Sequence, residues 1–254
     1  MFSTAFAIEQ KNIIHVPFSE NPPIIDGQWS KSDEWNDAVV TSVGNDSDVF
    51  YILAKHDKSH VYFMIDLINE QDDAKSFGMY DANNTLITAR SAAGVCFDTH
   101  NDGGEKMKND DFCFVGYEVI RNNSANSTIF VGDSLIGIHP PEEYKFINTF
   151  SNKNDPYESM QHNIYEIQVP ISDVKNSSNF GFATFVLDPV SDGTSRHLNW
   201  PYSSGLRPNT WGLIEISNHT MTSNEIEKNM PAPKSIENIL STLWHFIMGL
   251  FYKH

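Results

Sequence analysis

The sequence has little positive charge and only two cysteines. Its 254 residues hold 17 Lys and Arg against 33 Asp and Glu, which gives a formal net charge of −16. This balance argues against nucleic acid as a partner, because a polyanion repels phosphate instead of releasing its counterions. Cys96 and Cys113 have no second cysteine at C-x-x-C spacing, which argues against a thiolate zinc site. The H-E-x-x-H, Walker and dinucleotide-binding motifs are also absent from the sequence.

Helical periodicity is scarce over most of the chain, and alternation with a period of two takes its place. In HVYFMIDLI, the side chains of Val61, Phe63, Ile65 and Leu67 share one face of an extended strand. Similar short runs, such as IYEIQV and WGLIEIS, recur between turn residues of the Gly, Asn, Asp and Pro types. The pattern predicts an all-β fold over residues 13–217, a two-sheet antiparallel β-sandwich of the jelly-roll type.

The two ends of the chain differ in composition from the middle. Residues 1–12 are expected to be a signal remnant or a disordered N-terminus, since Ala5-Phe6-Ala7 has the small-x-small form of a cleavage site. Residues 218–235 have the composition of a linker, and 236–254 are predicted to form an amphipathic helix. The apolar part of that helix falls short of a membrane span. A membrane surface, a partner protein and the sandwich itself are its alternative contacts.

Export to the cell surface or the extracellular space is the expected localisation. Besides the N-terminal segment, the chain carries Asn-x-Ser/Thr sequons, the acceptor pattern for N-glycosylation. These sequons begin at Asn45, Asn83, Asn122, Asn126, Asn176 and Asn218. Cys96 and Cys113 lie in two strand-like runs that could be adjacent. An exported protein would favour a disulfide between them, and two buried thiols are the alternative.

The most concentrated acidic segment is the loop FDTHNDGGEKMKNDDF at residues 97–112. Its oxygen-bearing side chains are Asp98, Asn101, Asp102, Asp110 and Asp111. Hard oxygen ligands in a flexible loop suit Ca²⁺, although the spacing here is not that of an EF-hand. The loop is therefore a candidate calcium site, and a solvated acidic hairpin is the alternative.

A turn followed by a short helical segment is predicted near the N-terminus, in PPIIDGQWSKSDEW. Asp26-Gly27 is a turn signal, and Ser30 and Asp33 stand at capping-box spacing ahead of Trp35. HVYFMIDLIN, VCFDTHNDGG, YEIQVPISDV, FGFATFVLD, HLNWP and WGLIEIS follow in that order. Over roughly residues 20–217 the series resembles family 9 carbohydrate-binding modules and their DOMON-like relatives. The resemblance implies a sandwich that binds carbohydrate or glycoconjugate without catalysis, and it makes structural calcium more plausible.

The segment 192–208 combines aromatic rings with hydrogen-bonding side chains, the mixture that sugar recognition demands. The indole of Trp200 could stack on the apolar face of a pyranose ring, with polar neighbours bonding its hydroxyls. The candidate sugar contacts are Trp200, Tyr202, Arg196, Asn199 and Arg207, with Tyr80 or Phe77 as a second wall. The alternative for Trp200 is a plug at one end of the sandwich. Trp35 and Trp211 are expected to lie in the core.

Two short features point to other functions. GDSL at 132–135 matches the nucleophile block of esterases, in which Ser134 would attack an ester. It sits mid-chain in a β pattern and no Asp-x-x-His follows, which argues against an esterase. Haem binding is the second alternative, as in domains that resemble the cytochrome subunit of ethylbenzene dehydrogenase. Met64, Met79 and Met107 are candidate axial ligands, although Met64 in an alternating strand is expected to fill space between sheets.

Overall fold

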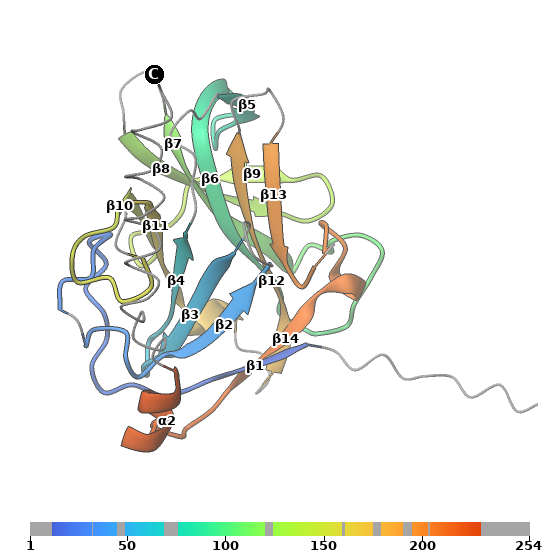
Figure 1. The fold of residues 1–254 in the computed structure, drawn as a ribbon. Coiled ribbons are helices and arrows are strands. Elements are labelled where there is room, and N and C mark those ends of the chain that lie inside the picture. The colour runs from blue at the N-terminus through green and yellow to red at the C-terminus, as the bar shows by residue number, and fades with distance from the viewer. Residues whose placement is uncertain are drawn as a thin grey trace, which may run out of the picture.

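The protein was analysed as a computed structural model, which describes residues 12–31, 33–44, 49–68, 76–119, 124–158, 161–174, 179–189, 195–202 and 204–229. The strands form two sheets packed face to face (Figure 1). The strands are β1 (Ile13–Val16), β2 (Val39–Val43), β3 (Phe50–His56), β4 (His60–Leu67), β5 (Phe77–Tyr80), β6 (Leu86–Asp98), β7 (Asp111–Val119), β8 (Ser124–Val131), β9 (Ile136–Ile138), β10 (Lys145–Phe150), β11 (Asn163–Pro170), β12 (Asn179–Pro189), β13 (Ser195–Trp200) and β14 (Gly212–Ile216). The helices are α1 (Ile171–Val174), the 3-10 turn η1 (Pro208–Thr210) and α2 (Ser223–Asn229).

The predicted β-sandwich is confirmed. One sheet has five strands in the order β10-β11-β4-β3-β2. The other has nine strands, with β1-β14-β12-β6-β7-β8-β9 in its main path, β13 beside β12 and β5 beside β6. The pairing between described strands is antiparallel except at one edge, where β1 lies parallel to β14. The prediction of an antiparallel sandwich therefore needs one amendment, at the edge where the first and last strands meet.

Apolar side chains from the two inner faces fill the space between the sheets. Val61, Phe63, Ile65 and Leu67 of β4 are completely buried there, as their alternation predicts. The ring of Phe63 stacks on that of Phe182 from the opposite sheet, with 5.1 Å between the ring centroids. Burying one such side chain contributes about 1.5–3 kcal/mol, so this layer is the main source of stability.

The outer face of the five-stranded sheet is covered by the segment that carries the predicted Asp-Gly turn. Gly27 has φ of +77°, a left-handed conformation that glycine adopts without strain. The carboxylate of Glu166, on β11, accepts hydrogen bonds from the backbone amides of Asp26 and Gly27 at 2.9 and 2.7 Å, and from Trp35 Nε1 at 3.2 Å. Trp35 is 1% exposed, so the expectation of a core position is confirmed.

A buried lysine holds the same segment from the neighbouring strand. The ammonium of Lys55 donates to the carbonyl oxygens of Asn21 and Glu34 at 2.9 and 2.7 Å and to Asp37 Oδ1 at 2.9 Å. Its side chain is fully buried, and the ring of Trp35 lies 5.6 Å from the ammonium. Because each of the three donors of the ammonium has a partner, the charge is tolerated under the covering segment.

The segment predicted to be a linker contains a helix, α2. Thr222 and Glu225 make the glutamate half of a capping box, in which Glu225 Oε2 accepts from the backbone amide of Thr222, and here also from its hydroxyl. These bonds lower the pKa of Glu225 to about 2. The helix predicted at 236–254 lies outside the described residues. So do residues 1–11 of the segment 1–12, which is expected to be a signal remnant or a disordered N-terminus. Within the described residues, no helix is long and apolar enough to cross a membrane.

Candidate functional site

The predicted sugar-stacking tryptophan lies in the core. Trp200 is 7% exposed, and its ring lies 5.7 Å from that of Phe182 between the sheets. In β13, Leu198 and Trp200 share the inward face, and only the alternate positions His197 and Asn199 can face outward. The expectation that Trp200 offers an exposed stacking face is therefore wrong, and its alternative as a core plug is correct.

The other predicted sugar contacts differ in how far they are exposed to solvent. Tyr202 is 90% exposed and Tyr80 is 56% exposed, whereas Phe77 and Asn199 are half-buried. Arg207 is exposed immediately before η1. The side chain of Arg196 lies outside the described part of the chain. The structure thus does not gather these residues around Trp200 as the sequence predicts.

Two of them, Asn199 and Phe77, line separate but adjoining hollows over the outer face of the nine-stranded sheet. One hollow of about 350 Å³ is lined by Asn199, and a second of about 250 Å³ is lined by Phe77. Both hollows are lined by Phe185, Leu187 and Leu206, so they adjoin. We call the two together the disulfide groove. Its other lining residues are Gly78, Met79, Ala92, Cys96, Cys113, Val115, Phe130, Leu135, Ala183, Thr184, His197, Ser204 and Gly205.

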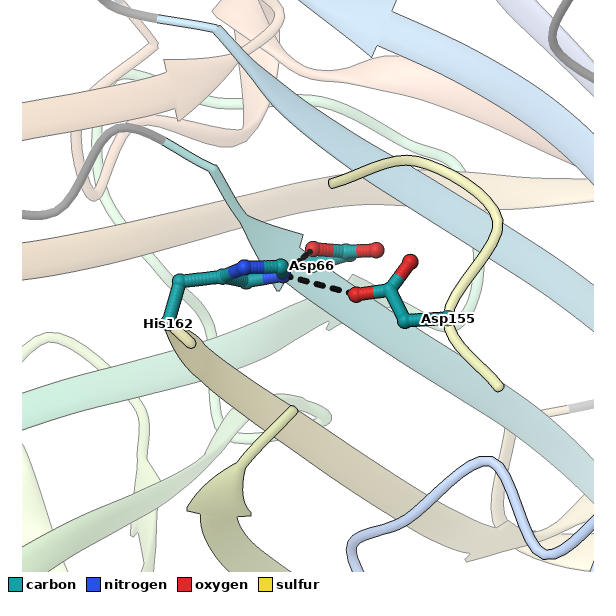
Figure 2. A group of neighbouring side chains, drawn as sticks. All are labelled: Asp66, Asp155 and His162. Carbon is teal, nitrogen blue, oxygen red and sulfur yellow. Dashed lines mark hydrogen bonds and ion pairs between the residues drawn. The ribbon is translucent and has the colours of Figure 1, made fainter. Parts of the chain in front are cut away.

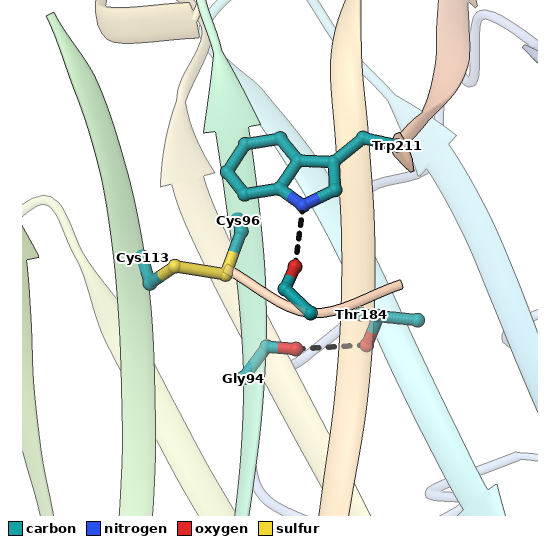
Figure 3. The surroundings of a disulfide bond; sticks show 6 residues. Gly94, Cys96, Cys113, Thr184 and Trp211 are labelled. Carbon is teal, nitrogen blue, oxygen red and sulfur yellow. Dashed lines mark hydrogen bonds between the residues drawn. A yellow bond between two sulfur atoms is a disulfide. The ribbon is translucent and has the colours of Figure 1, made fainter. Parts of the chain in front are cut away.

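The floor of the groove contains a disulfide, which is one of the two states that the sequence leaves open for Cys96 and Cys113. Cys96 on β6 and Cys113 on β7 are directly opposite in the strand register and are bonded, with their Cα atoms 4.0 Å apart (Figure 3). Trp211, 2% exposed, packs in the same apolar cluster, and its Nε1 donates to the carbonyl oxygen of Gly205 at 2.7 Å. That bond ties the 204–206 wall of the groove to Trp211. The burial of Trp211 confirms the expectation that it lies in the core.

The groove has both flat apolar faces and hydrogen-bonding groups. The ring of Phe185 lies over Gly94, where an added Cβ would come within 2.7 Å of the ring. His197, Asn199 and Ser204 bring polar side chains to the first hollow. An aromatic surface beside polar groups suits a ligand that presents a C–H face and hydroxyls. Sequence reasoning did not select Phe185 or His197, although the inward phase of Phe182 and Val186 predicts that Phe185 faces outward.

The acidic loop gathers several of the predicted calcium ligands. Oxygens of Asp98, Asp110 and Asp111 lie within 4.8 Å of one another. Asn101 Oδ1 and Asp111 Oδ1 are buried without a hydrogen-bond partner, so two oxygens in this loop lack the compensation that burial requires. Burial raises the pKa of Asp111 to about 6, and the negative charges of Asp98, Asp110 and Asp102 add to the rise. These oxygens fit a hard cation such as Ca²⁺.

Not every predicted member of that set is free to join it. Asp102 forms an ion pair with the ammonium of Lys108 at 2.6 Å. Asp110 Oδ2 lies 2.5 Å from Nδ1 of His100. The carboxylate of Asp98 and the carboxylate of Asp111 also accept hydrogen bonds from backbone amides of the loop. Asp102 is not among the carboxylates that lie within 4.8 Å of one another, whereas Asp110 is, despite its contact with His100. The ligand set that the geometry favours is Asp98, Asn101, Asp110 and Asp111.

The residues of the two alternative functions are placed as follows. Ser134 of the GDSL motif is exposed in the turn between β8 and β9, and the adjacent Asp133 pairs with Lys106 at 2.7 Å. That turn lacks the strand-to-helix context of the esterase motif. Met64 is fully buried in a cluster with Trp29 and Trp35 on the outer face of the five-stranded sheet. Met107 is 4% exposed in the cluster of Trp211. Met79 lines the disulfide groove.

Comparison with known proteins gives a likeness of structure alone. No protein-family model and no curated protein matches the sequence. Among solved structures, a family 9 carbohydrate-binding module from Caldicellulosiruptor kristjanssonii in complex with cellotriose matches with a TM-score of 0.55 and 16% identity. The match covers 84% of this chain and 96% of the module. The same kind of module in complex with glucose matches with the same score and identity, over 100% of its length. The chain thus has the fold of a family 9 carbohydrate-binding module.

Proposed function

We propose that this chain is a non-catalytic module that binds carbohydrate, and that the disulfide groove is its binding site. The observation that carries the proposal is the groove itself, in which Phe185 and Phe77 lie near the polar side chains of His197, Asn199 and Ser204. The two similar structures, seen with cellotriose and with glucose, support a saccharide as the ligand. Tyr202 and Arg207, exposed beside the 204–206 wall, would lie at the rim.

The first test is a glycan array, which surveys many saccharides for binding to the whole chain. Isothermal titration calorimetry with glucose and with cellotriose then measures the affinity. Phe185→Ala should weaken binding by about 1–3 kcal/mol, by analogy with the loss of an interface hot spot. Phe150→Ala is the matched control, because Phe150 is 50% exposed on β10 of the other sheet. Equal affinity in both variants would remove the groove from the proposal. A Soret absorption band in the purified protein would instead favour the haem alternative.

We also propose that Asp98, Asn101, Asp110 and Asp111 hold a structural calcium ion. The buried oxygens of Asn101 and Asp111 without partners support this ligand set. Calcium that binds only the native state should raise the melting temperature with its concentration, and EGTA should reverse the rise. Asp111→Asn should abolish the response, whereas Asp133→Asn, at an exposed carboxylate in the adjacent turn, should keep it. An identical response in the two variants would contradict the site.

Export is proposed as the localisation. The disulfide agrees with an oxidising compartment, and the described sequon residues Asn83, Asn126 and Asn218 are exposed and so open to glycosylation. Expression in a glycosylating host should give a protein whose mobility increases on treatment with a glycosidase. Accumulation of unglycosylated, reduced protein inside the cell would contradict the proposal.

A further inference from the structure

Three ionisable side chains meet in a buried position far from the groove, on the outer face of the five-stranded sheet. Asp66 is on β4, His162 immediately precedes β11, and Asp155 is in the connecting segment after β10 (Figure 2). His162 Nε2 lies 2.6 Å from Asp66 Oδ1 and 2.9 Å from Asp155 Oδ2. All three side chains are 2% exposed or less. Two carboxylates therefore converge on one ring nitrogen in a site without water access.

A single proton on that nitrogen does not satisfy the arrangement. The Nε2–Asp66 contact has hydrogen-bond geometry, but Asp155 Oδ2 and Asp66 Oδ2 are buried with no hydrogen-bond partner. The imidazole supplies at most one positive charge against two carboxylates, so the ionised trio keeps a net negative charge. A cation bound by the trio would remove that excess charge.

The second nitrogen of the imidazole is oriented by Ser151. His162 Nδ1 lies 3.2 Å from Ser151 Oγ, and the backbone amide of His162 donates to the same oxygen at 3.1 Å. The amide of Ser151 donates in turn to the carbonyl oxygen of His162 at 2.7 Å. When Nδ1–H donates to the hydroxyl, Nε2 presents a lone pair to the two carboxylates. A metal-binding histidine commonly has such an outer hydrogen bond, which fixes its tautomer and its ring.

We propose that Asp66, Asp155 and His162 form a structural site for a divalent transition metal, with Zn²⁺ as the best fit. One imidazole nitrogen and two carboxylate oxygens make a mixed donor set that suits Zn²⁺ better than Ca²⁺, which prefers oxygen alone. Tetrahedral ligand atoms about 2.1 Å from zinc lie roughly 3.4 Å apart. The trio, at 2.6 and 2.9 Å, needs to spread by less than an ångström to admit the ion.

The ion would fasten a covering segment to the sheet. Asp155 belongs to the same segment as Tyr157, whose ring lies 4.3 Å from that of Tyr51 and 6.0 Å from that of Trp29. Asp155 Oδ1 also accepts from the backbone amide of Tyr157 at 2.7 Å. Metal bound between β4 and Asp155 would therefore hold these aromatic rings over the sheet. This role is independent of carbohydrate binding at the groove.

The test is titration of chelator-stripped full-length protein with ZnCl₂, followed by calorimetry and by elemental analysis after dialysis. We expect one bound zinc per chain and a melting temperature that rises with zinc concentration. Asp155→Asn should remove both effects while keeping the side-chain volume and the oxygen that Tyr157 bonds. The melting curve of the metal-free variant, compared with metal-free wild type, shows whether it folds. His162→Gln provides a second, independent variant.

His219→Gln is the matched control, since it removes an exposed histidine that pairs with Glu225 at 3.0 Å. It should keep stoichiometric zinc. Zinc retained by both Asp155→Asn and His162→Gln, zinc lost in the control, or no zinc in the wild type would overturn the proposal. Calcium that replaces zinc at one equivalent and depends on Asp155 would overturn the choice of metal.

Discussion

The two outer faces of the sandwich differ, because one is covered by other segments of the chain and the other is open. The five-stranded sheet is covered by residues 17–31 and 33–38 and by the segment around Asp155, and charged side chains are buried beneath this cover. The nine-stranded sheet carries an apolar outer face with a disulfide in its middle, and the groove above it is open. Buried charge marks the closed face, and accessible aromatic surface marks the open one.

This difference separates stability from recognition. A buried charge is costly unless each of its partners is in place, so the closed face tolerates little variation. Half-buried rings such as Phe185 leave surface that a ligand can cover, which stabilises the complex instead of the fold. Substitutions on the closed face should therefore unfold the protein without altering the affinity of the folded fraction. Substitutions at the groove rim should do the reverse.

The largest effect is expected from Lys55→Met on the closed face. The change leaves Asp37 and two carbonyl oxygens without their donor, at a cost of about 3–5 kcal/mol in the free energy of unfolding. Denaturant titration measures this cost. Lys106→Met is the matched control, because its ion pair with Asp133 is exposed and should be worth less than about 1 kcal/mol. Similar losses in both variants would contradict the description of the closed face.

Removal of the disulfide should have the next largest effect, and on the open face. Cys96 and Cys113 are 17 residues apart, and a cross-link over a loop of this length stabilises by about 3 kcal/mol. The double variant Cys96→Ala with Cys113→Ala should also bind saccharide more weakly, because both cysteines are lining residues of the groove. Reductant should destabilise the wild type and leave the double variant unchanged. Unaltered saccharide affinity in the folded double variant would show that the ligand lies elsewhere.

Glu166→Gln should cost about 1–3 kcal/mol below pH 8, since the amide nitrogen of Gln accepts no hydrogen bond and the variant cannot receive all three bonds that the two carboxyl oxygens of Glu166 accept. Burial raises the pKa of Glu166 from 4.5 to about 8. The folded state therefore binds this proton more tightly than the unfolded state. The resulting stabilisation is complete below pH 4.5 and is lost as the pH rises through about 8.

Between pH 4.5 and about 8, the free energy of unfolding should therefore decrease less steeply with pH in Glu166→Gln than in the wild type. Denaturation midpoints at a series of pH values measure the slope. Glu142→Gln, at an exposed glutamate before β10, should leave the slope of the wild type unchanged. A Glu166→Gln slope equal to that of the control would contradict a raised pKa.

The smallest effect on stability is expected from Asn199→Ala in the groove. Asn199 is half-buried without a role in the core, so unfolding should change by about 0.5 kcal/mol or less. Loss of one hydrogen bond to a bound saccharide should weaken binding by about 1 kcal/mol, roughly fivefold. Calorimetric titration measures the affinity, and Asn218→Ala at an exposed position outside the groove serves as control. Unchanged affinity would exclude Asn199 from the site.

The strand pattern could be predicted from the sequence because one residue in two is driven toward the core. The same rule predicts that Leu198 and Trp200 share a face, and that Asn199 lies on the other. The flat ring and polar neighbours of Trp200 favour it as a stacking residue, but its phase in the strand turns it toward the core. The disulfide was left open because the sequence does not give the register that sets Cys96 opposite Cys113.

Contacts between distant segments could not be predicted in this way. Glu166 lies 140 residues after the turn that it binds, and His162 lies 96 residues after Asp66. No spacing rule joins such residues, because their meeting depends on which strands become neighbours. The grouping of carboxylates in the acidic loop was predictable because they are close in sequence, and β6 and β7 fold the loop into a hairpin. Local chemistry was therefore readable from the sequence, and chemistry between strands was not.

The parallel pairing of β1 with β14 determines how the sandwich would bear mechanical load. Ile13 lies beside Leu213 and Val16 beside Ile216, and backbone bonds to Asn12 and from Ser217 extend the ladder at both ends. Tension applied between residues 12 and 217 would pull these strands past each other along their length. Hydrogen bonds loaded in shear share the force and must break together, whereas a peeled pair loses them one at a time. A sandwich pulled at residues 12 and 217 would therefore resist extension at the β1–β14 pair.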